Sequence, residues 1–285
     1  MRILDGERPL LTIIVPTVGR KDEFFRLAET LIAQTCNLNG LELIISDQNH
    51  NSLILEAVNS LKKRINTTHI KCELISTSYA KNRALQLSSG TYCAFLDDDC
   101  WLPNNFLEVL FPFLLLKKDG YLTNALDAEN KPLLGKGLPK DFLLDCKSKD
   151  GAFYTPQIAH IYMTDAVLEL GGFNEKLGVG TEYGSAEETD LLVRLLNIGQ
   201  KFIYLDQVSV FHPSVNYETV TPDKCFRYGL GFGAFCKIHG WNSYWIYKTI
   251  RSFVASVTYI FISRPRARNY FFSGVGRFIG YWRYK

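Results

Sequence analysis

Short apolar runs alternate with stretches of helical spacing over the first hundred residues. Each run is four to six residues long and ends at proline, glycine or polar residues, which is the pattern of a strand buried on both faces. The runs are LLTIIV at 10–15, LELII at 41–45, the segment 72–75 and TYCAFL at 91–96. Helical spacing between them predicts helices over 21–35, 52–65 and 80–87. This alternation predicts an α/β fold with a mostly parallel sheet and helices on both faces.

The pattern is less regular beyond residue 100. Helical spacing recurs over 106–116 and 186–197, and the segment between them reads mainly as loop with a strand or two in 117–150. Glycines are frequent over 171–184, which predicts a mobile loop. Two short apolar runs, 201–205 and 208–211, predict two more strands.

Polar residues stand where three of the predicted strands end. They are Pro16-Thr17, Asp47 and Asp97-Asp98-Asp99. Ligands of parallel sheets gather at the carboxyl ends of the strands, so these residues are expected to converge on one crevice.

The three adjacent aspartates are the strongest chemical signal. Because like charges repel, such a cluster favours a cation, and Mg²⁺ or Mn²⁺ binds one or two carboxylates together with substrate phosphates. Side chains alternate along an extended chain, so Asp97 and Asp99 are expected to face one way and Asp98 the other. The alternative is a solvated acidic turn or a helix cap.

A second acidic group, Glu187-Glu188-Thr189-Asp190, opens the predicted helix at 186–197. Acidic residues commonly complement the dipole of a first helical turn. The functional interpretation is that Glu188 acts as a general base that removes a proton from an attacking hydroxyl.

Several single residues each allow two interpretations. Asp47 could accept hydrogen bonds from a nucleoside or start a turn with Asn49. Lys81 and Arg83 could neutralise phosphates or lie on a solvated helix face. His212 could be a third metal ligand, a diphosphate contact or a structural histidine.

Composition narrows the class of protein. The chain of 285 residues is 47% apolar, which suffices for one large domain with or without an appendage and argues against disorder. Its seven cysteines are scattered and form no CxxC pair, so a disulfide framework or zinc site is not expected and a reducing compartment is. The start of the sequence lacks the apolar core of a signal peptide, which predicts a protein facing the cytosol.

Charge and aromatic residues are distributed unevenly. Residues 224–285 carry eleven Lys or Arg, no Asp or Glu, and 18 of the 38 aromatic residues, whereas 1–223 carry 21 basic and 29 acidic residues. We therefore expect a catalytic domain at 1–223 and a helical extension at 224–285 that contacts an anionic surface, either membrane or nucleic acid. The uncharged run at 252–263 is shorter than the ~20 residues of a membrane span, so it is expected to lie at the interface. Gly229, Gly231 and Gly233 follow no predicted strand and therefore suggest close helix packing or an approach to lipid, not a dinucleotide site.

Four ordered segments resemble the family 2 glycosyltransferases. They are TIIVPTVGR, LIISDQN, SYAKNRALQLSSGTYCAFLDDDC and GGFNEKLGVGTEYGSAEETDLLVRLL, within about residues 10–215. The resemblance implies the GT-A fold, a Rossmann-like mixed sheet, and transfer of a sugar from a nucleotide-sugar donor with inversion at the anomeric carbon.

The resemblance also implies roles for individual residues. The nucleoside would be held by Pro16, Thr17, Arg20 and Asp47. The family's Arg-Asn step matches Lys81-Asn82, and Lys81 or Arg83 would stabilise the departing diphosphate. Asp97 would face the ribose or the metal, Asp98 completes the DxD motif, and Asp99 would bind Mn²⁺ or Mg²⁺, with His212 as a further candidate ligand. The family's acidic pair matches Glu187-Glu188, with Glu188 as the base and Asp190 in support.

The extension resembles the C-terminal segments of bacterial enzymes that build surface polysaccharides. This implies a saccharide or polyprenyl-diphosphate-linked acceptor, a UDP-sugar donor, no nucleic-acid partner and a peripheral location on the inner face of the cell membrane. One alternative is a sugar nucleotidyltransferase, although the segment PTVGRKDE lacks the glycine-rich phosphate loop of those enzymes. The other is a non-catalytic membrane or nucleic-acid binding protein that acts through the basic extension.

Overall fold

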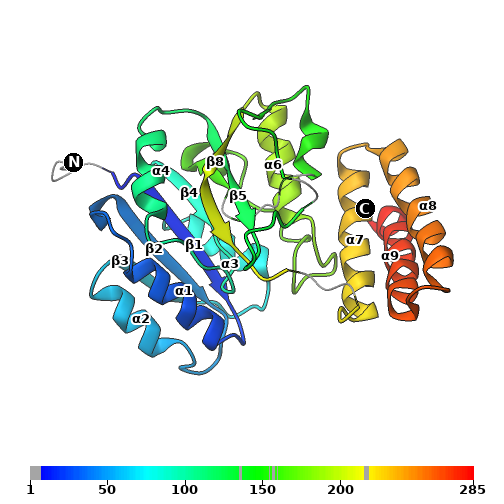
Figure 1. Ribbon diagram of the computed structural model, residues 1–285, viewed down its shortest axis with the longest axis horizontal. Coiled ribbons are helices and arrows are strands. Elements are labelled where there is room, and N and C mark those ends of the chain that lie inside the picture. Colours follow the sequence, from blue (N-terminus) through cyan, green and yellow to red (C-terminus); the bar gives the residue numbers. More distant parts are fainter. Residues whose placement is uncertain (1–7, 135–136, 154, 156–157, 159, 215–217) are drawn as a thin grey trace. The chain divides into compact units, whose positions relative to one another are not determined.

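The computed structural model describes residues 8–134, 137–153, 155, 158, 160–214 and 218–285 (Figure 1). The chain divides into two compact units. The first, here called the sheet unit, comprises Met1–Ile75, Tyr79–Gly172 and Leu191–Ser214. The second, here called the helical unit, comprises Ser76–Ser78, Phe173–Asp190 and Val215–Lys285.

The described part of the sheet unit contains one sheet of eight strands in the order β3-β2-β1-β4-β7-β5-β8-β6. The strands are β1 (Leu11–Thr17), β2 (Leu41–Asp47), β3 (Asn66–Lys71), β4 (Tyr92–Phe95), β5 (Gly120–Leu126), β6 (Leu143–Leu144), β7 (Ile161–Met163) and β8 (Phe202–Phe211). Pairing is parallel between β3, β2, β1 and β4 and between β5 and β8, while β7 and β6 run antiparallel to their neighbours. The predicted mixed, mostly parallel α/β sheet is confirmed.

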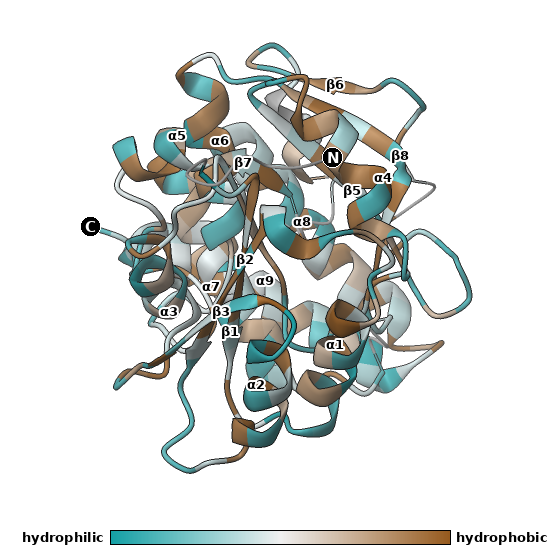
Figure 2. Ribbon diagram, turned by 90° about the vertical axis from the view of Figure 1, so that its left-hand side faces the viewer, coloured by the Kyte–Doolittle hydropathy of each residue, from teal (hydrophilic) through white to brown (hydrophobic). Residues whose placement is uncertain are grey.

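The five helices that the spacing predicted in this part of the chain are present, and the short α5 was not predicted. The helices are α1 (Asp22–Ile32), α2 (Leu55–Lys62), α3 (Thr77–Leu85), α4 (Phe106–Leu114), α5 (Thr164–Glu169) and α6 (Glu187–Asn197), with short 3₁₀ turns at Leu38–Gly40 and Lys149–Phe153. Leu27 of α1 and Leu110 of α4 share one buried cluster with Ile13 of β1. Ile14 is also fully buried, and it points to the other face of the sheet, so both faces are covered. Figure 2 colours α2 partly teal and partly brown, as expected of a helix with one exposed face.

Two strand predictions are wrong. The strand expected at 72–75 is β3, six residues earlier at Asn66–Lys71. β3 lies at the sheet edge and half of its residues are exposed, so it lacks the apolar run that marks a central strand. The strands expected at 201–205 and 208–211 are one strand, β8, whose register against β5 shifts between Thr123 and Asn124. This bulge exposes Asp206 and Gln207 and interrupts the apolar pattern.

The helical unit contains three long helices, α7 (Pro222–Ile238), α8 (Asn242–Tyr259) and α9 (Arg264–Arg283), here called the helical bundle. Thr221 and Ser263 cap the starts of α7 and α9 with their side-chain oxygens, and a proline stands in the first turn of both helices. A Cβ added at Gly229 or Gly233 would lie within 2.6 Å of the backbone of α9, so these glycines serve close helix packing. The predicted boundary after Asp223 stays a prediction.

None of the helices in the described ranges has both the length and the hydropathy of a membrane span. Residues 252–259 of the apolar run at 252–263 belong to α8.

Candidate active site

Asp97, Asp99 and His212 meet at the carboxyl edge of the sheet. One ligand atom from each lies within 4.8 Å of the others. His212 Nε2 is 3.2 Å from Asp99 Oδ1 and 3.9 Å from Asp97 Oδ2. Paired backbone hydrogen bonds between Trp101 and Phe211 bring the end of β8 beside the turn that follows β4. Two carboxylates and an imidazole so arranged can hold a divalent cation.

Arg20 forms ion pairs with two of the three aspartates in the turn after β4. Its Nη1 lies 2.7 Å from both Asp98 Oδ1 and Asp99 Oδ2. Burial raises the pKa of Asp98 despite this contact. Burial also opposes ionisation of Asp99, but hydrogen bonding to His212 and the charge of Arg20 outweigh it and lower the pKa of Asp99. Of these two carboxyl groups, Asp99 is therefore the one whose charged form the surroundings favour.

His212 is affected reciprocally. Burial lowers its pKa, but the Asp99 carboxylate outweighs burial, so the pKa of His212 is raised. Its Nδ1 lies 2.7 Å from the carbonyl oxygen of Pro213, which orients the ring so that Nε2 faces the aspartates.

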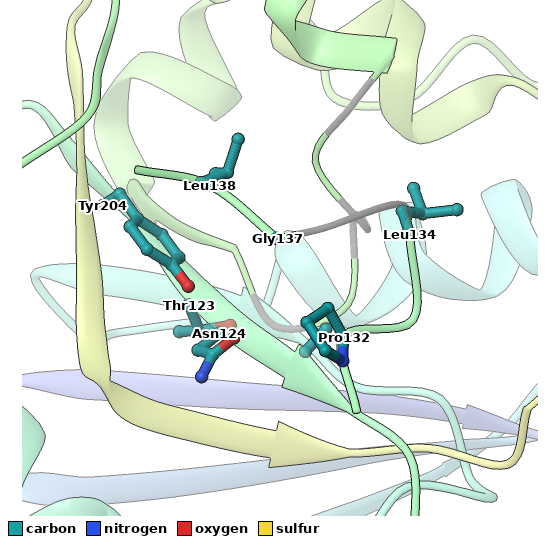
Figure 3. A pocket seen from close by; sticks show the side chains of 8 residues that line it. Thr123, Asn124, Pro132, Leu134, Gly137, Leu138 and Tyr204 are labelled. Atoms are coloured by element: carbon teal, nitrogen blue, oxygen red, sulfur yellow. The ribbon is translucent and has the colours of Figure 1, made fainter. Parts of the chain in front are cut away.

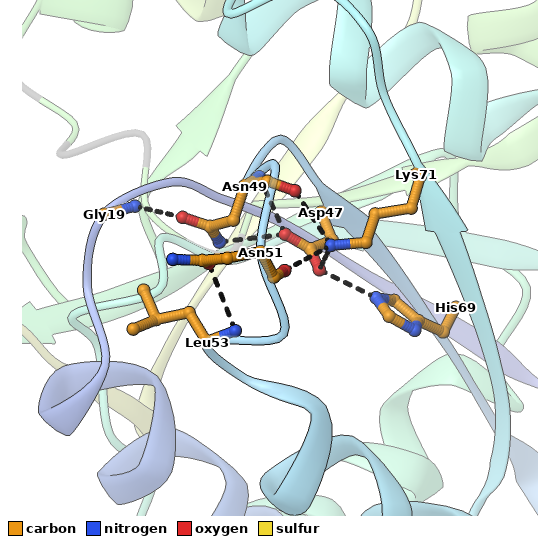
Figure 4. A network of polar contacts seen from close by, with 7 residues as sticks. All are labelled: Gly19, Asp47, Asn49, Asn51, Leu53, His69 and Lys71. Atoms are coloured by element: carbon orange, nitrogen blue, oxygen red, sulfur yellow. Dashed lines mark hydrogen bonds and ion pairs between the residues drawn. The ribbon is translucent and has the colours of Figure 1, made fainter.

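Asp47 is the centre of a second polar network (Figure 4). Its side chain is 1% exposed. Oδ1 accepts hydrogen bonds from the backbone and side-chain nitrogens of Asn49, and Oδ2 lies 3.0 Å from His69 Nε2 and 2.7 Å from Lys71 Nζ. Burial acts to raise the pKa of Asp47, but these contacts hold it at about 2.

The network joins the loops that follow the first two strands. Asn49 Oδ1 accepts a hydrogen bond from the backbone nitrogen of Gly19, whose φ of +72° suits glycine. Lys71 also donates to the carbonyl oxygens of Asn49 and Asn51 at 2.8 Å each. Thr17 pairs in register with Asp47, and Pro16 with Ser46, so the predicted nucleoside residues lie on neighbouring strand ends.

The residues before β4 differ in exposure. Lys81 is 1% exposed, Asn82 is half-buried and Arg83 is exposed. Asn82 packs against Gly172, where an added Cβ would lie 2.4 Å from Asn82 Oδ1. The helix face thus presents Arg83 to solvent and Lys81 to the protein interior.

The predicted acidic turn belongs to the helical unit, at the start of α6. Glu187 is buried beside Gly178, whose Cβ would lie 3.0 Å from the Glu187 carboxyl carbon. Asp190 is buried and its Oδ1 lies 2.9 Å from His239 Nε2 of α7. Glu188 is half-buried. The catalytic role of this turn stays a prediction.

Sequence reasoning missed the partners of the acids. His69 and Lys71 are two residues apart on an edge strand and so share one face, a signal hidden because β3 was placed too late in the sequence. Arg26 also went unnoticed: it donates to the carbonyl oxygen of Asp99 at 2.6 Å and stacks over Trp101.

Two hollows in the sheet unit lie apart from these residues. The smaller, of about 10 Å³, lies beside β5 and includes Asn124, Pro132 and Tyr204 (Figure 3). The larger, of about 540 Å³, is lined by residues that include Phe113, Lys140 and Asp206. The first is far smaller than a ligand site, and neither is lined by Asp97, Asp99 or His212. The candidate site is therefore defined by its polar residues.

The fold and the sequence together define the class of protein. The sequence model described as "Glycosyl transferase family 2" matches residues 12–168, more than half of the chain. The chain belongs to this family and is a glycosyltransferase.

Individual proteins resemble the chain over most of its length. It is 27% identical to a GalNAc(5)-diNAcBac-PP-undecaprenol beta-1,3-glucosyltransferase of Campylobacter jejuni, over 81% of this chain and 74% of the relative. Among solved structures, S. aureus TarS 1-349 in complex with UDP-GlcNAc has a TM-score of 0.61 at 18% identity, covering 78% of this chain and 65% of that one. The mannosyltransferase PcManGT of Pyrobaculum calidifontis in complex with GDP-Man and Mn²⁺ has a TM-score of 0.59 at 15% identity, covering 80% and 63%. These structural likenesses support the GT-A fold.

Proposed function

We propose that this glycosyltransferase moves a sugar from a nucleotide-sugar donor to a saccharide hydroxyl with inversion at the anomeric carbon. The observation that carries the proposal is the meeting of Asp97, Asp99 and His212 within 4.8 Å at the carboxyl edge of the sheet. A donor diphosphate requires compensation of its negative charge at such an edge, and a divalent cation held by these strand-end residues would supply it.

The side chains of Asp97, Asp99 and His212 are suited to bind a divalent cation. Carboxylate oxygens suit Mn²⁺ and Mg²⁺, and an imidazole favours Mn²⁺ over Mg²⁺. Asp97, Asp99 and His212 would hold the ion, which would neutralise charge on the donor diphosphate. Arg20 lies 2.7 Å from both Asp98 and Asp99, and its charge together with the contact of His212 lowers the pKa of Asp99.

We assign the nucleoside of the donor to the ends of β1 and β2. Pro16, Thr17 and Arg20 would contact it directly, and Asp47 would act through the loop that it organises with Asn49. Lys81, Asn82 and Arg83, from the helix before β4, would serve the phosphates.

Glu188 is the proposed general base, with Glu187 and Asp190 in support. A carboxylate at this position can accept the proton of the acceptor hydroxyl as its oxygen attacks the anomeric carbon. The leaving nucleoside diphosphate departs from the opposite face, so the configuration inverts. The pairing of Asp190 with His239 fixes the turn that carries Glu188.

The acceptor and donor classes rest on relatives. The similar C. jejuni enzyme is named for an undecaprenol-linked acceptor, and the similar TarS structure holds UDP-GlcNAc. We propose a UDP-sugar donor and a lipid-linked saccharide acceptor in cell-surface polysaccharide synthesis. A peripheral protein on the cytoplasmic face of the membrane suits this acceptor, and all seven cysteines are unpaired, as in a reducing compartment.

Two substitutions test the assignment. Glu188→Gln is expected to lower kcat by about 10²-fold or more, because proton transfer to a carboxylate is lost. Asp99→Asn is expected to abolish Mn²⁺-dependent transfer. Glu56→Gln and Asp22→Asn are the matched controls, since both acids lie in the first turn of another helix. Transfer at the control rate in both test variants, with folding verified by thermal unfolding, would refute the assigned site.

A further inference from the structure

Helix α8 is packed with its polar side inward. Its buried residues are Thr249, Ser252 and Ser256. On the opposite side, Ile250, Val254 and Val257 are 57%, 56% and 60% exposed. A helix on the surface of a water-soluble domain normally turns its aliphatic stripe toward the core. The reversed arrangement means that the aliphatic side of α8 is available to something other than the protein's own interior.

Helix α9 shows the same reversal. Its buried positions include Asn269, Gly276 and Gly280, whereas Phe271, Phe278 and Trp282 are exposed. Helices that associate in contact with lipid pack in this way, with small residues between the helices and large apolar residues on the exposed side.

The exposed sides of the two helices are continuous. Rings from α8 contact rings from α9: Phe253 lies 6.0 Å from Phe271, and Trp245 lies 6.2 Å from Phe278 and 6.4 Å from Trp282. We call the surface formed by Ile250, Val254, Val257, Phe271, Phe278 and Trp282 the apolar face. Its area is drawn from two helices, so it is not a set of scattered exposed residues.

Charge identifies the kind of surface that covers the apolar face. The segment 224–285 has eleven basic and no acidic residues, so two copies placed face to face would repel each other. Arg264 and Arg268 at the start of α9 are exposed, whereas the exposed Arg283 at its end is paired with Glu182 at 2.9 Å. The cations beside the apolar residues of α9 are therefore concentrated at the start of the helix. Apolar residues flanked by Arg and aromatic rings are the composition of an element that lies at an anionic lipid surface.

We infer that the apolar face is the docking surface of this protein on one leaflet of an anionic membrane. Since no helix of the described residues suits a membrane span, the contact is with a single leaflet. The biological role of this docking, which is to bring the enzyme to a lipid-linked acceptor, rests on the proposed function. The packing and the charge are independent of that proposal.

Vesicle flotation measures membrane binding in the absence of sugar donor, metal and acceptor. A negative result would therefore count against the docking surface and not against the proposed sugar transfer. The full chain is expected to float with vesicles of phosphatidylglycerol and phosphatidylcholine and to be released by salt, because exposed charges are screened. Ile250→Gln with Val257→Gln is expected to weaken vesicle binding about tenfold or more, because buried apolar area is lost.

Leu87→Gln with Leu116→Gln is the matched control, since these leucines are 52% and 60% exposed in the sheet unit. The control is expected to float like the unaltered chain. Equal flotation of the two double variants would overturn the inference, and so would failure of the unaltered chain to float. A dimer in light scattering that dissociates in the Ile250/Val257 variant, or binding to RNA without binding to vesicles, would assign the face to those partners instead.

Depth of insertion gives a second readout. Trp282 is 65% exposed, so brominated lipids are expected to quench part of the tryptophan emission of the unaltered chain and less of that of Trp282→Phe. Identical quenching in both proteins would show that Trp282 stays out of the leaflet and would contradict the assigned face.

Discussion

Three adjacent carboxylates are tolerated at the end of β4 because each has a basic side chain as a neighbour. Arg20 contacts Asp98 and Asp99, and His212 contacts Asp99 and approaches Asp97. Asp97 and Asp99 both approach His212, but Asp99 lies as close to Arg20 as Asp98 does, so the predicted alternation stays a prediction. Repulsion alone predicted a cation at this place, but only the structure identifies which basic side chains of the protein lie there.

The depressed pKa of Asp47 predicts an acid-sensitive contribution to stability. Its folded pKa of about 2 is below the ordinary 3.8, so the contribution is complete above about pH 4 and is lost as the pH falls toward 2. Asp47→Asn is expected to reduce the free energy of unfolding by about 2 kcal/mol at neutral pH. On acidification this variant is expected to lose less of its remaining stability than the unaltered chain loses. Urea unfolding at both pH values measures this. Asp22→Asn is the control, and an unchanged pH dependence in Asp47→Asn would contradict the network.

Lys71 is predicted to act through the loop and not on the reaction. Lys71→Met removes its hydrogen bonds to Asn49 and Asn51 and should raise the KM for the donor about 3- to 10-fold with little change in kcat. Lys62→Met, on an exposed position of α2, is the control. Steady-state kinetics at varied donor concentration measures both constants. A fall in kcat with an unchanged KM would mean that the loop does not contribute to donor binding.

At the level of elements, apolar runs in the sequence correctly located the central strands of the sheet. They did not locate the edge strand β3. β1, β2 and β4 are buried along their whole length, so each appears in the sequence as an uninterrupted run. β3 and β8 do not, because β3 is exposed on one side and β8 contains a bulge. The helices from α1 to α4 were predictable because the spacing of their buried residues survives small errors in where each helix begins.

The contact of α7 with α9 predicts a sharp contrast among glycines of one helix. A Cβ at Gly276 or Gly280 would lie 2.2 Å and 2.1 Å from the backbone oxygens of Phe226 and Leu230. Gly276→Ala and Gly280→Ala are therefore expected to destabilise the helical bundle by about 1–3 kcal/mol through overpacking. Thermal unfolding followed by circular dichroism measures the change.

Gly274→Ala is the matched control, because the three atoms nearest to its Cβ all belong to the ring of Phe253, at 3.0 Å or more. That ring can shift, and alanine has the higher helix propensity, so this variant is expected to be as stable as the unaltered chain or slightly more stable. A similar loss in all three variants would show that helix propensity or ring packing, and not backbone contact, governs the site.

For the molecule as a whole, the family was predictable from four ordered motifs, while the division into compact units was not. The sequence placed a boundary after Asp223, where charge changes. The structure groups Phe173–Asp190 with the helical bundle, because Gly231 of α7 packs against Ser185 and His239 pairs with Asp190. Contacts between segments so distant in sequence leave no periodic signal.

Ligand binding to the whole protein gives the broadest prediction. A UDP-sugar with Mn²⁺ is expected to raise the melting temperature, since a ligand at 100 times its Kd stabilises the fold by about 2.7 kcal/mol. GDP-sugars at the same concentration are the comparison, and Asp99→Asn should lose the Mn²⁺-dependent part of the shift. A larger shift with a GDP-sugar would assign the donor to that nucleotide.

The hydrogen bond between Asp190 and His239 ties the turn of Glu188 to the same compact unit that carries the apolar face. On the proposed docking geometry, the height of Glu188, the proposed base, above the lipid headgroups is then set by how deep α8 and α9 insert into the leaflet. The proposed base would then reach only those acceptor hydroxyls that lie within a limited range of distances from the lipid.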